Sequence, residues 1–100
     1  MEKNQSKGDK QMVAEWIENG AVVVDVRTKS EFADGHFPGS INIPVDVLPN
    51  ELGLLKNKQS KIIVYCRSGA RSERAKQILS ASGYLFVINA GGLSDLPNAR

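Results

Sequence analysis

The segment KIIVYCRSGARS, residues 61–72, decides the fold and holds the residues with the clearest chemistry. Its first part, residues 62–65, is a short apolar run rich in β-branched side chains, which is typical of a strand buried on both faces. The run ends at Cys66, the only cysteine in the sequence. A loop of small residues between Arg67 and Arg71 follows, and a helical pattern begins at Ser72. The thiol is therefore expected between the end of a buried strand and the start of a helix.

This position favours the ionised form of the thiol. The start of a helix leaves backbone N–H groups without partners and carries partial positive charge from the helix dipole. Gly69 allows a tight turn that points further N–H groups inward, and Arg67 and Arg71 add two positive charges. We therefore predict a thiol pKa below its ordinary value of about 8.5, and an anion site beside the sulfur. We interpret Cys66 as a nucleophile; the alternative is a buried, inert cysteine.

Composition indicates one globular domain. A chain of 100 residues with 41% hydrophobic content can build one modest core. A net charge of +2 is too small to indicate binding to nucleic acid or to a membrane surface. No apolar run reaches the ~20 residues that span a bilayer. One cysteine excludes an intramolecular disulfide, and no Cys/His cluster indicates a metal site.

The polar N-terminal residues predict a flexible segment over residues 1–8, followed by one domain over residues 9–100. The N-terminal segment lacks the apolar core of a secretory signal, which indicates a cytoplasmic protein. A signal peptide removed upstream would leave the same printed sequence, and the protein would then be periplasmic. We expect a monomer.

Strand and helix patterns alternate along the chain. Helices are predicted from a cap at Asp9 to Gly20, from a cap at Ser30 to Gly35, within residues 46–56 after Pro49, and over residues 72–82. Strands are predicted over residues 21–26, 41–43, 62–65 and 84–88, and residues 90–93 are expected to turn away. Such alternation predicts an α/β fold with a mostly parallel central sheet and helices on both faces. Ligands of these folds bind at the carboxyl ends of strands, where Cys66 is expected.

Three segments of the sequence resemble the rhodanese family, in the family's order. The first runs from Asp25 and Arg27, within VDVR, through Glu31-Phe32 to the residues GHFPGSINIP at 35–44. The second, residues 65–72, resembles the family's active-site loop. Gly83-Tyr84 and the residues NAGGL at 89–93 resemble its closing segment. The compact form is similar to single-domain thiosulfate sulfurtransferases of the bacterial phage-shock-protein-E type.

The resemblance implies a rhodanese-like fold and sulfur transfer in two steps, with no metal or cofactor. The Cys66 thiolate would take the outer sulfur of thiosulfate, or of a related persulfide donor, and pass it to cyanide or another thiophilic acceptor. The loop would bind the anionic substrate. Its backbone N–H groups would surround the persulfide, and Arg67 and Arg71 would orient the thiosulfate oxygens. The implied substrate-binding residues are Arg67, Ser68, Gly69, Ala70, Arg71 and Ser72.

Four other residues have structural interpretations. His36 is the only histidine, and the resemblance places it in a turn, so we interpret it as structural rather than as a catalytic partner of Cys66. Asp25 and Arg27 are interpreted as a pair at a strand end that fixes nearby loops. Trp16 is expected to anchor the first helix to the core.

The sequence leaves three alternative functions to consider. Cysteine phosphatases and arsenate reductases need five residues between cysteine and arginine, whereas Cys66 and Arg71 have four between them and Ser72 follows, which favours a sulfurtransferase. Non-catalytic rhodanese-like modules typically lack the cysteine that is present here. A sulfur carrier with a protein donor or acceptor would use the same residues as an enzyme, so the sequence does not separate these two functions.

Overall fold

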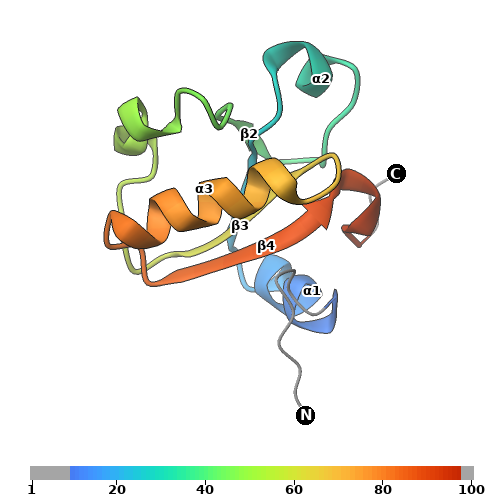
Figure 1. The fold of residues 1–100 in the computed structure, drawn as a ribbon. Helices are drawn as coiled ribbons and strands as arrows, with labels where there is room; N and C mark the ends of the chain where they lie inside the picture. The colour runs from blue at the N-terminus through green and yellow to red at the C-terminus, as the bar shows by residue number, and fades with distance from the viewer. Residues whose placement is uncertain (1–9, 98–100) are drawn as a thin grey trace.

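A computed structural model describes residues 10–97, whose strands form one parallel sheet in the order β2-β1-β3-β4 (Figure 1). The strands are Val22–Asp25 (β1), Ile41–Asn42 (β2), Lys61–Cys66 (β3) and Phe86–Gly92 (β4). Each pair of neighbouring strands is parallel. This confirms the α/β fold predicted from the alternation of strand and helix patterns. The predicted flexible segment, residues 1–8, lies outside the described residues.

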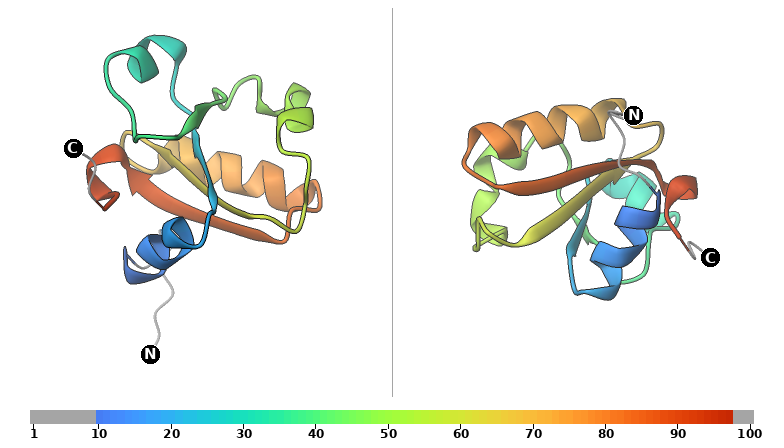
Figure 2. Two further views of the ribbon diagram at one scale, coloured as in Figure 1. Left: turned by 180° about the vertical axis from the view of Figure 1, so that it is seen from behind. Right: turned by 90° about the horizontal axis from the view of Figure 1, so that it is seen from below.

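Helices cover both faces of the sheet, as predicted. The α-helices are Lys10–Glu18 (α1), Lys29–Ala33 (α2) and Ala70–Ala81 (α3). Short 3₁₀ turns lie at Leu48–Asn50 (η1), Leu52–Leu54 (η2) and Leu93–Asp95 (η3). The right-hand view of Figure 2 shows α3 on one side of β3 and β4 and α1 on the other.

Alternation along β3 divides the core into two layers. Ile62, Val64 and Cys66 belong to the layer that α3 covers, whereas Ile63 and Tyr65 belong to the layer that contains Val13 of α1. Successive side chains of a strand point to opposite faces, so this division follows from the sequence order. Burying one such apolar side chain stabilises the fold by about 1.5–3 kcal/mol. Consequently Cys66 lies on the α3 face at the carboxyl end of β3, and Tyr65 lies on the opposite face.

The helix predicted after Pro49 is wrong. That segment forms the separate turns η1 and η2, and Glu51 between them has a φ of −121°. Leu48 and Leu55 are buried and Leu52 packs against the same layer. These three leucines have the spacing of one helical face, although they do not lie on one helix. Pro49 removes a backbone donor and Gly53 lowers helix propensity, and the chain follows the core in two short turns instead.

Several predicted boundaries also differ by one or a few residues. Helix α2 is capped by Thr28 rather than Ser30, because the Thr28 side chain accepts from the Glu31 N–H and Glu31 reaches back to the Thr28 N–H. Helix α3 begins at Ala70, two residues earlier than predicted. Strand β4 continues to Gly92 rather than turning away at residue 90, because its last residues still pair with the end of β3.

Candidate active site

The Cys66 thiol lies at the end of β3, under the loop that leads into α3. The residue is only 1% exposed. The Gly69 N–H donates to Cys66 Sγ at 3.0 Å, and the Ser72 hydroxyl oxygen lies 3.4 Å from the sulfur. The loop therefore turns toward the thiol, as the sequence predicted.

The backbone of Gly69 makes this arrangement possible. Its φ of 104° lies in the left-handed region, which glycine adopts at little steric cost, and it immediately precedes α3. The turn aims consecutive N–H groups at one atom, as in an anion-binding nest.

The same hydrogen bonds change the acidity of the thiol. Burial raises the pKa of Cys66, but hydrogen bonds from the Ser72 hydroxyl and from the backbone N–H groups of Ser72, Gly69 and Ser68 more than compensate. The thiol pKa is therefore lowered from its ordinary value, in the direction that the sequence predicted.

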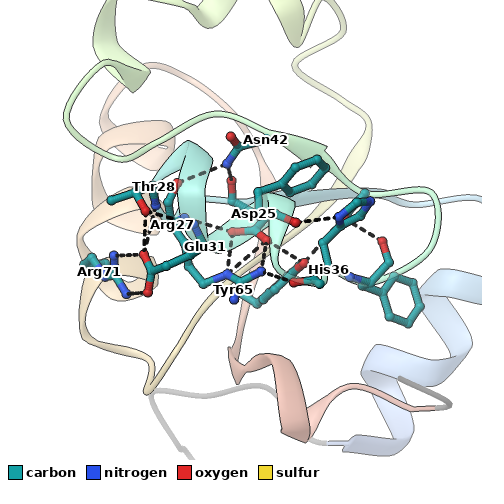
Figure 3. Close-up of polar contacts among 12 residues, drawn as sticks. Asp25, Arg27, Thr28, Glu31, His36, Asn42, Tyr65 and Arg71 are labelled. Carbon is teal, nitrogen blue, oxygen red and sulfur yellow. Dashed lines mark hydrogen bonds and ion pairs between the residues drawn. The ribbon is translucent and has the colours of Figure 1, made fainter. Parts of the chain in front are cut away.

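Arg67 and Arg71 flank the loop but differ in their surroundings. Arg71 donates two hydrogen bonds to the Glu31 carboxylate, at 2.8 and 3.0 Å (Figure 3). Glu31 also accepts from the Thr28 N–H, so α2 holds this carboxylate in place. Arg67 is exposed and lines a recess of about 380 Å³ together with Arg27, Leu93 and Ser94. The sequence pointed to both arginines but gave no signal for the Glu31 partner.

Asn89 is a second site residue that sequence reasoning missed. Its side chain accepts from the Ser72 hydroxyl at 2.7 Å and donates to the Gly69 carbonyl at 3.1 Å. A buried asparagine near the end of an apolar strand is the signal that could have found it, because buried amides need hydrogen-bond partners.

Gly92 brings the end of β4 against the loop. A Cβ atom at this position would lie 2.2 Å from the Arg67 carbonyl oxygen, so only glycine allows this approach. The Gly92 N–H is held by the Asp95 carboxylate at 2.9 Å. The segment NAGGL therefore closes one side of the loop through backbone packing.

Asp25 and Arg27 form the structural pair that the sequence predicted (Figure 3). Arg27 Nη2 lies 2.6 Å from Asp25 Oδ2 and donates to the Gly35 carbonyl at 2.7 Å, which ties β1 to the turn after α2. The Tyr65 hydroxyl donates to the same carboxylate at 2.7 Å. Burial raises the pKa of Tyr65, so the phenol keeps the hydrogen that this bond uses.

His36 and Trp16 make structural contacts. His36 is exposed, its Nδ1 donates to the Phe32 carbonyl at 2.8 Å, and its ring stacks on Phe32 at 3.6 Å between centroids. Trp16 is partly buried and packs against the α1 layer of the core, as predicted.

Within residues 10–97, no group of three or more His, Cys, Asp or Glu side chains is arranged to hold a metal ion. Across the same part of the chain, no helix combines the length and apolar character needed to cross a membrane.

Residues 9–98 match the rhodanese-like domain family. The chain belongs to the rhodanese family. This confirms the resemblance carried by the loop around Cys66 and by the segments on either side of it.

Two curated relatives of this rhodanese domain are bacterial. Thiosulfate sulfurtransferase PspE of Escherichia coli K12 is 39% identical over 74 residues, which cover 73% of this chain and 71% of the relative. A sulfurtransferase of Allochromatium vinosum is 37% identical over 71 residues, which cover 71% of this chain and 65% of the relative. The domain is therefore homologous to thiosulfate sulfurtransferases.

A solved structure supports the same assignment. A rhodanese with anions from E. coli superimposes with a TM-score of 0.73 at 37% identity, over 78% of this chain and 93% of that one. The parallel sheet with α3 and α1 on its two faces is thus the rhodanese-like fold.

Proposed function

We propose that the protein is a sulfurtransferase that moves the sulfane sulfur of thiosulfate, or of a related persulfide donor, to cyanide or another thiophilic acceptor. The observation that carries this proposal is the Gly69 N–H directed at Cys66 Sγ, at 3.0 Å in a loop whose hydrogen bonds lower the thiol pKa. A thiolate is the nucleophilic form of cysteine, and a ring of amides stabilises negative charge on sulfur. The homology to thiosulfate sulfurtransferases supports the choice of donor.

The first step forms a persulfide on Cys66. The Sγ thiolate attacks the outer sulfur of thiosulfate and forms a new S–S bond. The bond from that sulfur to the sulfonate sulfur breaks, and its electron pair leaves with sulfite. The total charge is unchanged, no proton moves, and so a thiol that is already ionised needs no general base.

The second step regenerates the thiolate. The acceptor attacks the outer sulfur of the persulfide, the S–S bond to Cys66 breaks, and its electron pair returns to Sγ. With cyanide the product is thiocyanate. Between the two steps the outer sulfur carries the negative charge, which the loop N–H groups would stabilise.

The proposed substrate-binding residues are those of the loop, Arg67, Ser68, Gly69, Ala70, Arg71 and Ser72. Arg71 would act from a fixed position, because Glu31 holds its guanidinium. Arg67 is exposed and can adjust to the anion. Charge-assisted hydrogen bonds from arginine suit the sulfonate oxygens of a dianion.

Intact-mass measurement after treatment with thiosulfate tests the proposal. We expect the protein to gain the mass of one sulfur atom and to lose it when cyanide is added, with thiocyanate released. The Cys66→Ser variant is the matched control and should gain nothing. An unmodified mass for the wild-type protein, with Cys66 still open to alkylation, would show that the thiol does not accept sulfur from thiosulfate.

The same experiment separates an enzyme from a carrier. A persulfide that forms from a protein or small persulfide donor, but not from thiosulfate, would indicate a sulfur carrier. Repeated turnover of thiosulfate and cyanide would indicate the enzyme.

A further inference from the structure

The side-chain amide of Asn89 is buried beside the loop and uses all of its hydrogen-bonding capacity. Nδ2 donates to the Gly69 carbonyl and to Glu73 Oε1, both at 3.1 Å. Oδ1 accepts from the Gly91 N–H at 2.9 Å and from the Ser72 hydroxyl at 2.7 Å. Because the Gly91 N–H can only donate and the Gly69 carbonyl can only accept, these two groups fix the orientation of the amide.

Ser72 has a single hydroxyl hydrogen and several acceptors around it. Asn89 Oδ1 is the nearest at 2.7 Å, the Gly69 carbonyl lies at 3.1 Å, and Cys66 Sγ lies at 3.4 Å. One hydrogen makes one good bond at a time, and the shortest contact is the best bond between neutral groups. Beside a neutral thiol, Ser72 therefore donates to Asn89, and its lone pairs can accept from the Cys66 S–H.

An ionised sulfur changes this preference. Hydrogen bonds to a charged acceptor are roughly twice as strong as those between neutral groups. Rotation of the Ser72 hydroxyl turns its hydrogen toward Sγ, while Asn89 Oδ1 keeps the bond from Gly91. We propose that Asn89 is a positioning residue that fixes the Ser72 hydroxyl beside Cys66 and holds its hydrogen whenever Sγ carries no negative charge.

This inference rests on the proposed function, in which negative charge leaves Sγ for the outer sulfur and then returns. While the outer sulfur carries the charge, the Ser72 hydrogen returns to Asn89. When Sγ is the nucleophile, Ser72 stabilises it, but only after giving up its bond to Asn89. Asn89 thus limits how far the Ser72 hydroxyl stabilises the Cys66 thiolate. The nucleophilicity of a thiolate falls as its pKa falls, so this limit preserves the reactivity of Cys66.

Charged groups also surround this cluster and stay unchanged in the test. Arg67 and Arg71 lie on the loop side, and Glu73 accepts from Asn89 Nδ2. Asp95 accepts from the Gly92 N–H at the end of β4. On the opposite face of the sheet, Asp25 is paired with Arg27 and also accepts from the Tyr65 hydroxyl.

The test measures the pKa of the Cys66 thiol from the pH dependence of its alkylation by iodoacetamide. Cys66 is the only cysteine, and alkylation needs no sulfur donor, so the result does not depend on whether the protein transfers sulfur. Asn89→Ala is expected to lower the pKa by about 0.5–1 unit, because the Ser72 hydrogen is freed for the sulfur. Ser72→Ala should raise the pKa, and in that background Asn89→Ala should have less than half of its effect. The control Ser80→Ala, exposed on α3, should leave the pKa unchanged.

A second substitution keeps the test decisive. Asn89→Asp retains the acceptor oxygen and adds a charge that holds the Ser72 hydrogen more tightly, so it should raise the pKa, and by less when Ser72 is alanine. Opposite shifts for Asn89→Ala and Asn89→Asp support the proposal. Shifts in the same direction, or shifts that are equal with and without the Ser72 hydroxyl, overturn it. If Asn89→Ala does not fold, the comparison of Asn89→Asp in the two backgrounds decides alone.

Discussion

The Glu31 carboxylate and the Arg71 guanidinium form a two-bond ion pair, with N–O distances of 2.8 and 3.0 Å. The pair joins α2 to the first turn of α3, two segments that lie far apart in the sequence. The hydrogen bonds from Arg71 are the main cause that lowers the pKa of Glu31 to about 2, and the bond to Glu31 raises the pKa of Arg71. Both groups therefore stay charged at any ordinary pH, and Arg71 is presented to the site in a fixed position.

This fixed position predicts that Arg71 matters more than positive charge in general. We expect Arg71→Ala to lower kcat/KM for thiosulfate about tenfold or more, because a charge-assisted hydrogen bond contributes roughly 1.5–3 kcal/mol. Lys76→Ala removes the same charge from a later turn of α3 and should change kcat/KM less than twofold. Steady-state kinetics at constant ionic strength make the comparison. Equal losses in the two variants would show that bulk charge, not placement, serves the anion.

The same pair predicts a pH-dependent contribution to stability. Glu31 has a folded-state pKa of about 2, below its ordinary value of 4.5, so its contribution is present above pH 4.5 and is lost as pH falls toward 2. Glu31→Gln should therefore reduce the free energy of unfolding at pH 7 by about 1 kcal/mol. The expected loss is this small because both side chains are partly exposed and solvent screens the ion pair. Urea unfolding at several pH values measures the difference from wild type, which should shrink toward zero near pH 2. Glu51→Gln, at an exposed carboxylate, is the control. A difference that does not change with pH would assign the loss to helix capping alone.

Much of the fold could be predicted because buried parallel strands leave a clear pattern. Residues 62–65 and 21–26 are near-continuous apolar runs typical of a strand covered on both faces, and they contribute β3 and β1 to the sheet. The turn residues around Pro49 could not be predicted as well. Their leucines have a helical spacing, but they reach the core from two separate 3₁₀ turns, which local propensity does not distinguish from one helix.

In the candidate site, too, some residues could be predicted from the sequence and others could not. The loop residues beside Cys66 are local in sequence, so glycine and helix-start chemistry were enough to predict N–H groups aimed at the sulfur. Glu31 and Asn89 reach the loop from α2 and β4. An asparagine at the end of an apolar strand can be suspected of needing hydrogen-bond partners, but a single sequence does not show which distant segments supply them to Asn89 or to Glu31.

Behind the site, the buried Tyr65 hydroxyl supports a prediction about stability. Its OH donates to Asp25 Oδ2 at 2.7 Å and accepts from the Phe37 N–H at 3.0 Å. Tyr65→Phe leaves a buried carboxylate without one donor and a buried N–H without an acceptor. We expect the free energy of unfolding to fall by about 2–3 kcal/mol.

Tyr84→Phe provides the comparison for this variant. The Tyr84 hydroxyl donates to the Leu55 carbonyl, with the Leu52 carbonyl as a longer second contact at 3.2 Å. Both acceptors are neutral, so the loss on removing the hydroxyl should be smaller, about 1 kcal/mol. Urea denaturation of both variants at pH 7 gives the two values. A loss for Tyr65→Phe no larger than that for Tyr84→Phe would mean that Asp25 does not depend on the phenol.

The close approach of Gly92 to Arg67 predicts that a side chain at position 92 would change both the stability of the fold and the position of the loop. An added Cβ would lie 2.2 Å from the Arg67 carbonyl oxygen and 3.0 Å from its carbon, and these are backbone atoms that cannot rotate away. Gly92→Ala must therefore displace the start of the loop. We expect the free energy of unfolding to fall by roughly 1–3 kcal/mol, together with a changed rate of Cys66 alkylation.

Gly53→Ala is the matched control, because a Cβ there meets nothing within 4 Å. That variant should unfold within about 0.5 kcal/mol of wild type, with unchanged alkylation. Equal behaviour of the two variants would show that β4 can withdraw from the loop without affecting the thiol, and Gly92 would then have no part in shaping the site.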